Sequence, residues 1–353
     1  MYPQVSTELS ERIRIVRVLA IFFVVVIHLP EATNEMPAAS SWFTGVRHFL
    51  VDLIGRSAVP ILSAIAGYLA CVSYRDGHYT SYVVKRIGSI GIPMLIWNAI
   101  VMVMAFAAVA AGVQSTRAMS IVYEPVYDAL LGLTKTPANP PLYFLRDILV
   151  LSFCFPPLLV AARRFPIGLL AVATILAAVK WPLPILLRPN TLLFFCIGLV
   201  CAVRNVDLKK IDRFAIPILV VVIFFWTALL VAGRFKIESS SDAMLFFLNQ
   251  FAAASGLWIA SLYLLNNRFG SFVAKQEQYI FVVFLSHYPI FSVLGFAWKA
   301  KFGGYEYPTY LILFFLSFPI AMLSGAALWA MVQRSPTIKW LVSGKSSERK
   351  LPA

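Results

Sequence analysis

Apolar runs long enough to cross a lipid bilayer recur along almost the whole chain. A membrane-spanning helix needs about 20 consecutive, mostly apolar residues, and we expect about ten such spans within the 353 residues. Hydrophobic residues make up 60% of the sequence and charged residues 13%, a balance that a water-soluble domain could not carry on its surface. We therefore expect an all-α, polytopic integral membrane protein built as one helical bundle.

The boundaries of the expected spans follow from where the apolar runs end. Either the fifth or the sixth span is expected to be a short or broken helix, because prolines crowd their junction at 182–189. We expect one membrane domain at 1–340, followed by a basic cytoplasmic tail at 341–353. The expected spans are 13–30, 54–74, 90–112, 141–161, 166–184, 191–203, 214–233, 243–265, 279–299 and 309–332.

The distribution of Lys and Arg predicts the orientation of the helices. The formal net charge is +14, and most basic residues lie in short clusters on one side of the expected spans, as at 75–86 and 204–213. Cytoplasmic loops carry an excess of Lys and Arg, so we expect both termini in the cytoplasm of a bacterial inner membrane. Clusters between apolar runs, rather than one basic face, also argue against a nucleic-acid partner.

Three arginines, Arg12, Arg14 and Arg17, precede the apolar stretch of the first span, as basic residues do in a signal peptide. The residues that follow it, Leu29-Pro30-Glu31, are not a small-residue cleavage site. We therefore expect the first apolar run to be an uncleaved, membrane-spanning helix.

Two ionisable residues of the first span share one helix face. Arg17 and His28 are eleven residues apart, which returns the side chain to within roughly 20° of its starting direction, about 16 Å along the axis. Ionisable groups inside a span are costly and usually functional, so His28 is the candidate catalytic residue. Glu31 or Glu35 would fix its tautomer. The alternatives are a histidine bonded to a neighbouring helix and an arginine that anchors the topology.

The second span carries small residues in its middle. Ser63, Ala66 and Gly67 permit close approach of another helix. Tyr68, the next residue, carries a hydroxyl that needs a hydrogen-bond partner. Ordinary packing of small residues explains this stretch as well as a binding site does.

Basic residues follow the second span on its cytoplasmic side. Arg75, Lys85 and Arg86 precede Gly88, Gly91 and Pro93, where the third span begins. Basic side chains beside a kinkable helix start suit an anionic ligand, although any cytoplasmic loop is expected to carry such charge.

A second histidine interrupts an apolar run late in the chain. His287 lies two residues ahead of Pro289, and a polar break within a span usually lines a cavity. We expect either a secondary site role or a structural hydrogen bond. The connecting segments at 31–53 and 113–140 are expected on the outer face, each long enough to hold an interfacial helix over a cavity.

Together these motifs resemble the acyltransferase 3 family, membrane proteins that O-acylate polysaccharides, lipopolysaccharides and other glycans. They extend from residue 12 to about residue 290 in the family's order. The chain departs from the family pattern at Ala66, Ser89 and Tyr143, where Ser, Arg and Trp are usual. The matching motifs are Arg17-x10-His28, Val59-Pro60…Ala66-Gly67-Tyr68, Lys85-Arg86…Pro93, Leu142-Tyr143-Phe144-Leu145 and Leu285-Ser286-His287-Tyr288-Pro289.

The resemblance implies an acyl-coenzyme A co-substrate that enters from the cytoplasm and extends its pantetheine arm toward His28. No cofactor is expected to stay bound, and no metal. His28 would take the proton of a sugar hydroxyl. Direct attack on the thioester is favoured because no Ser or Cys with an adjacent base is visible, and a short-lived acyl-histidine is the alternative. The implied donor-binding residues are Arg17, Tyr68, Arg75, Lys85 and Arg86.

Acetyl is the first expected acyl group and succinyl the second. A succinyl carboxylate would need a further cation, from Arg56 or Arg146, unless Asp52 and Asp147 neutralise these arginines. The expected partners are acyl-CoA, a polysaccharide or lipid-linked oligosaccharide acceptor and membrane lipids, and assembly as a homo-oligomer stays open. The secondary site candidates are Glu31, Asp52, Arg56, Tyr143, Arg146 and His287.

Two other function classes fit the same residues. Intramembrane charges would also line the path of a transporter or flippase for an anionic or lipid-linked glycan, although no internal repeat is visible. A non-catalytic subunit of a polysaccharide-export machine is the second. Consumption of acyl-CoA would distinguish an enzyme from both.

Overall fold

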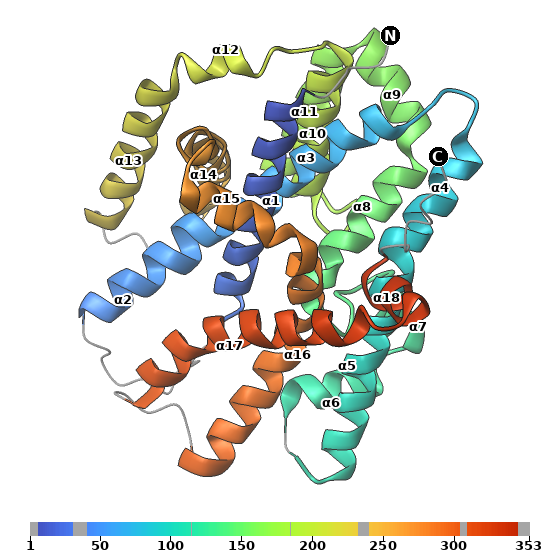
Figure 1. Ribbon diagram of the computed structural model, residues 1–353, viewed down its shortest axis with the longest axis vertical. Helices are drawn as coiled ribbons and strands as arrows, with labels where there is room; N and C mark the ends of the chain where they lie inside the picture. Colours follow the sequence, from blue (N-terminus) through green and yellow to red (C-terminus); the bar gives the residue numbers. More distant parts are fainter. Residues whose placement is uncertain are drawn as a thin grey trace.

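A helical bundle surrounds the first helix in the computed structural model, which describes residues 6–30, 41–113, 115–183, 185–231, 240–303 and 309–344. All regular secondary structure in these ranges is helical, with no strand among them. The first helix, α1 (Thr7–Ile27), runs through the middle of the bundle and contacts α3, α14 and α16 (Figure 1). The prediction of an all-α fold is confirmed.

The helices differ widely in length. The longer ones are α3 (Ala58–Ser73), α5 (Ile92–Ala110), α8 (Tyr143–Phe153), α9 (Phe155–Arg164), α10 (Pro166–Ala178), α11 (Pro189–Val203), α13 (Ala215–Val231), α14 (Ser240–Leu264), α16 (Glu277–Phe302) and α17 (Thr309–Val332). The shorter ones are α2 (Ser41–His48), η1 (Phe49–Ile54), η2 (Gly55–Ser57), α4 (Tyr79–Arg86), η3 (Ile87–Gly91), α6 (Thr116–Tyr123), α7 (Val126–Leu131), η4 (Pro140–Leu142), α12 (Lys209–Asp212), α15 (Arg268–Lys275) and α18 (Pro336–Ser343).

Five continuous helices within the described residues are long and apolar enough to cross a membrane. The pair α8 and α9 would make a sixth span, bent by 69°. Three further apolar helices, α10, α11 and α13, are shorter than a full span. Each of the ten expected segments contains a helix within the described residues, and the helices of the fifth and sixth are short, as predicted. The five long helices are Gly45–Ser73, Tyr79–Ala110, Met244–Leu264, Glu277–Phe302 and Thr309–Val332.

The second span begins earlier than the sequence predicts. The expected start at 54 is wrong, because α2 continues into α3 through the π-helix η1 and the 3-10 turn η2. The charges that suggested a loop neutralise one another: Asp52 binds His48 at 2.7 Å and Arg56 at 3.0 Å. Paired in this way at helical spacing, they do not end the helix.

The connection between the third and fourth spans contains the expected short helices. Within 113–140, α6 and α7 pack against α5. The third span itself is preceded by α4 and the π-helix η3, which contains Gly88 and Gly91. The glycine-rich start of this span is therefore a π-turn, a feature that frequently accompanies functional sites.

Two glycines bring the backbones of α3 and α11 into close contact. A Cβ atom at Gly67 would lie 2.0 Å from the Phe195 carbonyl oxygen, and one at Gly198 would lie 1.8 Å from that of Ala64. Each helix therefore presents a glycine to the backbone of the other. The predicted close approach at Gly67 is confirmed, and it holds α3 firmly against the bundle.

A buried arginine anchors the start of α1. Arg12 is only 2% exposed and donates to Asp212 at 2.7 Å, to Ser261 at 3.2 Å and to the Trp258 carbonyl at 3.2 Å. The guanidinium also lies 4.4 Å from the centre of the Trp258 ring. Arg12 therefore joins α1 to α12 and α14.

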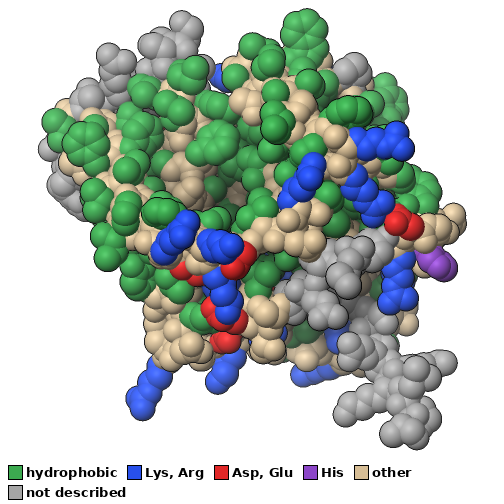
Figure 2. Space-filling view, turned by 90° about the horizontal axis from the view of Figure 1, so that it is seen from above, with side chains coloured by type: hydrophobic (Ala, Val, Ile, Leu, Met, Phe, Trp, Pro, Cys, Tyr) green, Lys and Arg blue, Asp and Glu red, His purple; other side chains and the backbone are tan. Residues whose placement is uncertain are grey.

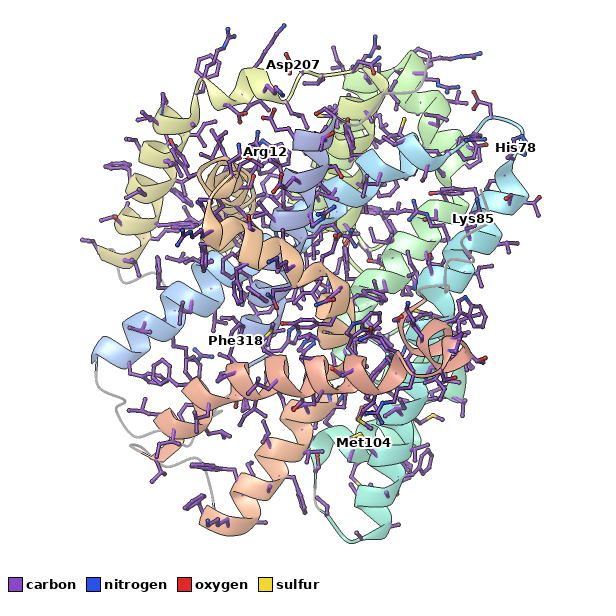
Figure 3. All side chains as sticks on the ribbon, viewed as in Figure 1. Arg12, His78, Lys85, Met104, Asp207 and Phe318 are labelled. Carbon is purple, nitrogen blue, oxygen red and sulfur yellow. The ribbon has the colours of Figure 1, made fainter. Side chains whose placement is uncertain are left out.

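The outer surface carries broad apolar areas. Large residues of α13 such as Ile216, Phe224 and Val231 are exposed, as expected of a helix that faces lipid. Figure 2 looks onto the end of the molecule where Asp207 lies in Figure 3, and shows Lys and Arg side chains beside apolar ones. Lys85 lies toward the same end and Met104 toward the other (Figure 3). Basic segments far apart in the sequence thus gather at one end.

Candidate active site

Two pairs of side chains join α1 to α16. Arg17 donates to Glu277 at 2.9 Å, and the His28 and His287 rings lie 5.3 Å apart, centre to centre, in an edge-to-face arrangement. The paired residues are eleven positions apart on α1 and ten on α16. The two helices therefore run in the same direction, with an ion pair about 15 Å below a histidine pair.

Both imidazole rings are held in the same tautomer by backbone carbonyls. A carbonyl only accepts hydrogen bonds, so Nδ1–H of His28 donates to Val24 at 2.7 Å and Nδ1–H of His287 donates to Phe284 at 2.7 Å. Each Nε2 therefore carries a lone pair. The Nε2 of His287 is buried and has no partner among the described residues, whereas His28 is partly exposed.

A polar contact supports α16 beside the histidines. Pro289 has no N–H, so it leaves the carbonyl of Leu285 without its usual helical donor. Nδ2 of Asn139 donates to that carbonyl at 2.9 Å. Asn139 is itself held by Asn98, whose Oδ1 accepts from its backbone N–H at 3.0 Å. The hydrogen bond that Pro289 removes from α16 is thus replaced by one from Asn139, in the segment between α7 and η4.

One cavity, which we call the Arg17 cavity, reaches from the Arg17–Glu277 pair toward the histidines. Its volume is about 730 Å³, within the range of small-molecule sites. Four cations and one carboxylate line it, so its charge is positive. Its apolar part includes Ile21 and Phe284, and the Phe284 ring lies 6.0 Å from that of His287. The charged lining residues are Arg14, Arg17, Arg86, Lys275 and Glu277.

A second cavity adjoins the first at Arg86 and Ser89, which line both. This Lys85 cavity has a volume of about 680 Å³ and is also lined by Arg75 and Lys85. The structure therefore brings the predicted basic residues together, and connects them through Arg86 to the space beside Arg17.

A third cavity lies beside the end of α1, where Ile27 lines it. This Arg188 cavity has a volume of about 930 Å³. It is lined by three cations, by aromatic rings and by amide and hydroxyl groups, with no acidic residue among the described lining residues. The residues that characterise it are Arg56, Tyr143, Lys180, Trp181, Arg188, Asn190, Thr191, Phe246 and Gln250.

Three helices, α1, α3 and α8, each contribute residues to both the Arg17 cavity and the Arg188 cavity. On α1, Ile21 lines the Arg17 cavity and Ile27 the Arg188 cavity, and the two residues are six positions apart. On α8, Phe144 lines the Arg17 cavity and the adjacent Tyr143 lines the Arg188 cavity. The Arg188 cavity thus comes within one residue of His28 through Ile27, and the Arg17 cavity comes beside His287 through Phe284, although neither histidine is among the residues that line the two cavities.

Comparisons with known proteins identify the family of the chain. The sequence model of a family described as an acyltransferase domain matches residues 11–330. The chain belongs to the acyltransferase 3 family. It is also 28% identical over 361 residues to the succinoglycan biosynthesis protein ExoH of Rhizobium meliloti (strain 1021), covering 98% of this chain and 95% of that protein. No solved structure matches the chain.

In this acyltransferase 3 protein, some predicted site residues lie apart from the histidines. Tyr68 lines a separate small pocket with Arg12, on another side of α3 from the Arg17 cavity. Asp52 is engaged by His48 and Arg56. Glu31 and Glu35 lie outside the described residues.

Arg146 serves the fold around the site. It pairs with the fully buried Asp147 at 2.9 Å and donates to the Ile185 carbonyl at 2.6 Å. Asp147 in turn accepts from the backbone N–H groups of Leu187 and Arg188, each at 3.0 Å. The pair therefore fastens the segment that lines the Arg188 cavity.

Glu277 and Asn139 are the site residues that the sequence analysis missed. Glu277 binds both Arg14 and Arg17 at 2.9 Å. Its signal was a carboxylate opening a long apolar run that also contains a histidine. For Asn139, the indication in the sequence was a single amide side chain between prolines.

Proposed function

We propose that the protein is a bacterial inner-membrane O-acyltransferase that transfers an acyl group from cytoplasmic acyl-CoA to a hydroxyl of a surface or exported glycan. One observation carries the proposal: the residues beside the histidine pair line two different cavities, Phe284 a cationic one and Ile27 one lined by amides, hydroxyls and aromatic rings. The family match supports the reaction class.

The donor is assigned to the two connected cationic cavities. The phosphates of coenzyme A would bind in the Lys85 cavity, where Arg75, Lys85 and Arg86 supply positive charge. Guanidinium and ammonium groups are the usual protein ligands of phosphate. The pantetheine arm would then pass Arg17 and cover the roughly 16 Å along α1 that separates Arg17 from His28.

In the proposed reaction, the histidine pair supplies a base and a neighbour that stabilises the protonated base. Nε2 of His28 takes the proton of the sugar hydroxyl while the oxygen forms a bond to the thioester carbonyl carbon. The carbon–sulfur bond then breaks, and the departing thiolate takes the proton from the His28 imidazolium. Nε2 of His287, on the neighbouring ring, would stabilise that cation. We favour direct transfer over an acyl-histidine because His28 then only accepts one proton and returns it, and no bond between its ring and the acyl group has to form and break.

The topology that fits this reaction has both termini in the cytoplasm and about ten crossings. Because α1 and α16 run in the same direction, an even number of crossings separates their starts, as it does when they are the first and ninth spans. The basic segments gathered at one end then face the cytoplasm. The Arg188 cavity falls on the opposite side, where an exported glycan would arrive.

The acyl group is proposed as acetyl first and succinyl second. Arg56 and Arg146, the cations considered for a succinyl carboxylate, are both engaged by aspartates. A glycan acceptor is supported by the relative's name, which assigns that protein to succinoglycan biosynthesis.

The test is acyl-CoA turnover by the purified, full-length protein in lipid nanodiscs. We expect release of free coenzyme A that depends on added glycan, and its loss in His28→Ala. Mass analysis of surface glycans from strains with and without the gene would identify the acyl group. Movement of a glycan across liposomes without thioester consumption would instead show a transporter.

A further inference from the structure

The Arg188 cavity has an excess of positive charge that the proposed transfer chemistry does not use. Arg56 is neutralised by Asp52, but no carboxylate of the described residues lies within ion-pair distance of Lys180 or Arg188, and none lines the cavity. The cavity lies on the side assigned as outer, where the positive-inside bias does not call for cations. Their presence there needs another explanation.

The start of α11 adds further attraction for an anion. Arg188 is its N-cap residue, and Asn190 and Thr191 in its first turn line the cavity. The positive end of the helix dipole favours negative charge, and this first turn contains no acidic residue. Pro189 has no N–H, and the N–H groups of Arg188 and Thr191 already donate to Asp147 and to the Arg188 carbonyl, so an anion here would be held mainly by side chains. Oγ1 of Thr191 is fully buried and has no partner among the described residues.

The remaining lining is suited to a sugar. Nδ2 of Asn190 donates to Oε1 of Gln250 at 2.9 Å, which fixes both amides at the cavity wall. Trp181 is 58% exposed at the same cavity, and an open aromatic face with nearby polar groups suits an amphipathic ligand. Amides and an aromatic ring beside unneutralised cations fit a carbohydrate-sized substrate that carries a carboxylate.

We propose that the Arg188 cavity binds a carboxylate of the substrate, with Lys180, Arg188 and the first turn of α11 as its receptor. The inference rests on the proposed function, because it assigns this cavity to the acceptor end of the transfer. The carboxylate has two possible sources: an acidic sugar of the acceptor, or a dicarboxylic acyl group such as succinyl that projects past His28. Both present the same group to the same cations.

The experiment measures acyl transfer by the full-length protein in nanodiscs. The acceptor is oligosaccharide released from the glycan of a strain lacking the gene, used intact or with its carboxylates methyl-esterified. Acetyl-CoA and succinyl-CoA serve as donors. The variants are Arg188→Gln, Arg188→Lys and Lys180→Gln, and Arg204→Gln at the opposite end of α11 is the matched control.

An acidic acceptor predicts one pattern of results. Arg188→Gln raises KM for the intact oligosaccharide about tenfold with either donor and leaves kcat within twofold. Arg188→Lys keeps part of the affinity, since the charge remains. The KM for the esterified oligosaccharide is the same for all variants. An acidic acyl group predicts instead that KM rises only for succinyl-CoA. Equal KM values for the wild type and both glutamine variants, on every substrate pair, would overturn the inference.

A binding measurement separates this inference from the proposed function. The Trp181 signal, taken as the fluorescence difference between wild type and Trp181→Phe, is titrated with intact and esterified oligosaccharide and with succinate. If acyl-CoA is not consumed but charge-dependent binding is lost in Arg188→Gln, the transfer reaction is refuted and the anion site stands. If transfer occurs while the Arg188→Gln variant binds and reacts normally, the anion site alone is refuted.

Discussion

Replacing Asn139 by alanine removes the donor that satisfies a buried carbonyl beside the histidine pair. Nδ2 of Asn139 lies 2.9 Å from the Leu285 oxygen, and Pro289 supplies no N–H to take its place. An unsatisfied buried carbonyl costs about 1–3 kcal/mol. We therefore expect Asn139→Ala to lower the free energy of unfolding by about 2 kcal/mol and to reduce kcat, because the turn that carries His287 is no longer held.

The contribution of the Asn139 hydrogen bond can be isolated by restoring the missing backbone donor. In Pro289→Ala the helix regains the N–H that reaches Leu285, so the same asparagine becomes dispensable. The double variant should be less destabilised than the sum of the single changes, with an interaction free energy of about 1 kcal/mol, within the usual range for coupled neighbours.

The assay is chemical unfolding in detergent micelles, followed by circular dichroism, for the wild type, the two single variants and the double variant. Acyl-CoA turnover is measured on the same samples. Strict additivity of the two changes would refute the view that Asn139 replaces the proline's absent hydrogen bond. So would an Asn139→Ala protein as stable as the wild type.

Three further changes test other parts of the site and fold. His28→Gln should lower kcat by at least about a hundredfold, the contribution of a positioned base, and glycan acylation above a tenth of the wild-type rate would contradict the base role. Arg86→Gln should raise KM for acyl-CoA about tenfold, the loss of a charge-assisted bond, with kcat retained; an unchanged KM would exclude phosphate binding there. Gly198→Ala should destabilise by about 1–3 kcal/mol through overpacking in thermal unfolding, whereas Gly168→Ala, whose Cβ would meet only Phe165 at 3.9 Å, should not.

The sequence predicted the chemistry of single helices better than their contacts. His28 and His287 were each recognised as polar breaks in apolar runs, but their pairing depends on how two helices about 260 positions apart in the chain pack together. The partner of Arg17 was missed for the same reason. Helical spacing shows which residues share a face, and does not show what that face meets.

The face of a fully apolar helix is the hardest feature to predict. Tyr68 and Ala66 are two positions apart on α3, yet Ala66 lines the Arg17 cavity and Tyr68 a separate pocket. In a membrane bundle both the lipid side and the protein side of a helix are apolar, so hydrophobic periodicity carries little information about direction. The Arg188 cavity could not be predicted either, because the prolines around Arg188 indicated only short or broken helices.

The end of α1 orients His28, the proposed base, through a backbone carbonyl, and no carboxylate of the described residues bonds to this imidazole. The last carbonyls of a helix lack intrahelical donors, and here the backbone N–H of His28 donates to Val25 at 3.2 Å instead of Val24. The Val24 oxygen is thereby free to accept the imidazole Nδ1–H at 2.7 Å. A neutral carbonyl fixes the tautomer as a carboxylate would, without placing a negative charge beside the thioester. In the proposed reaction, the lone pair of Nε2 is thus left for the acceptor hydroxyl because of where the helix ends.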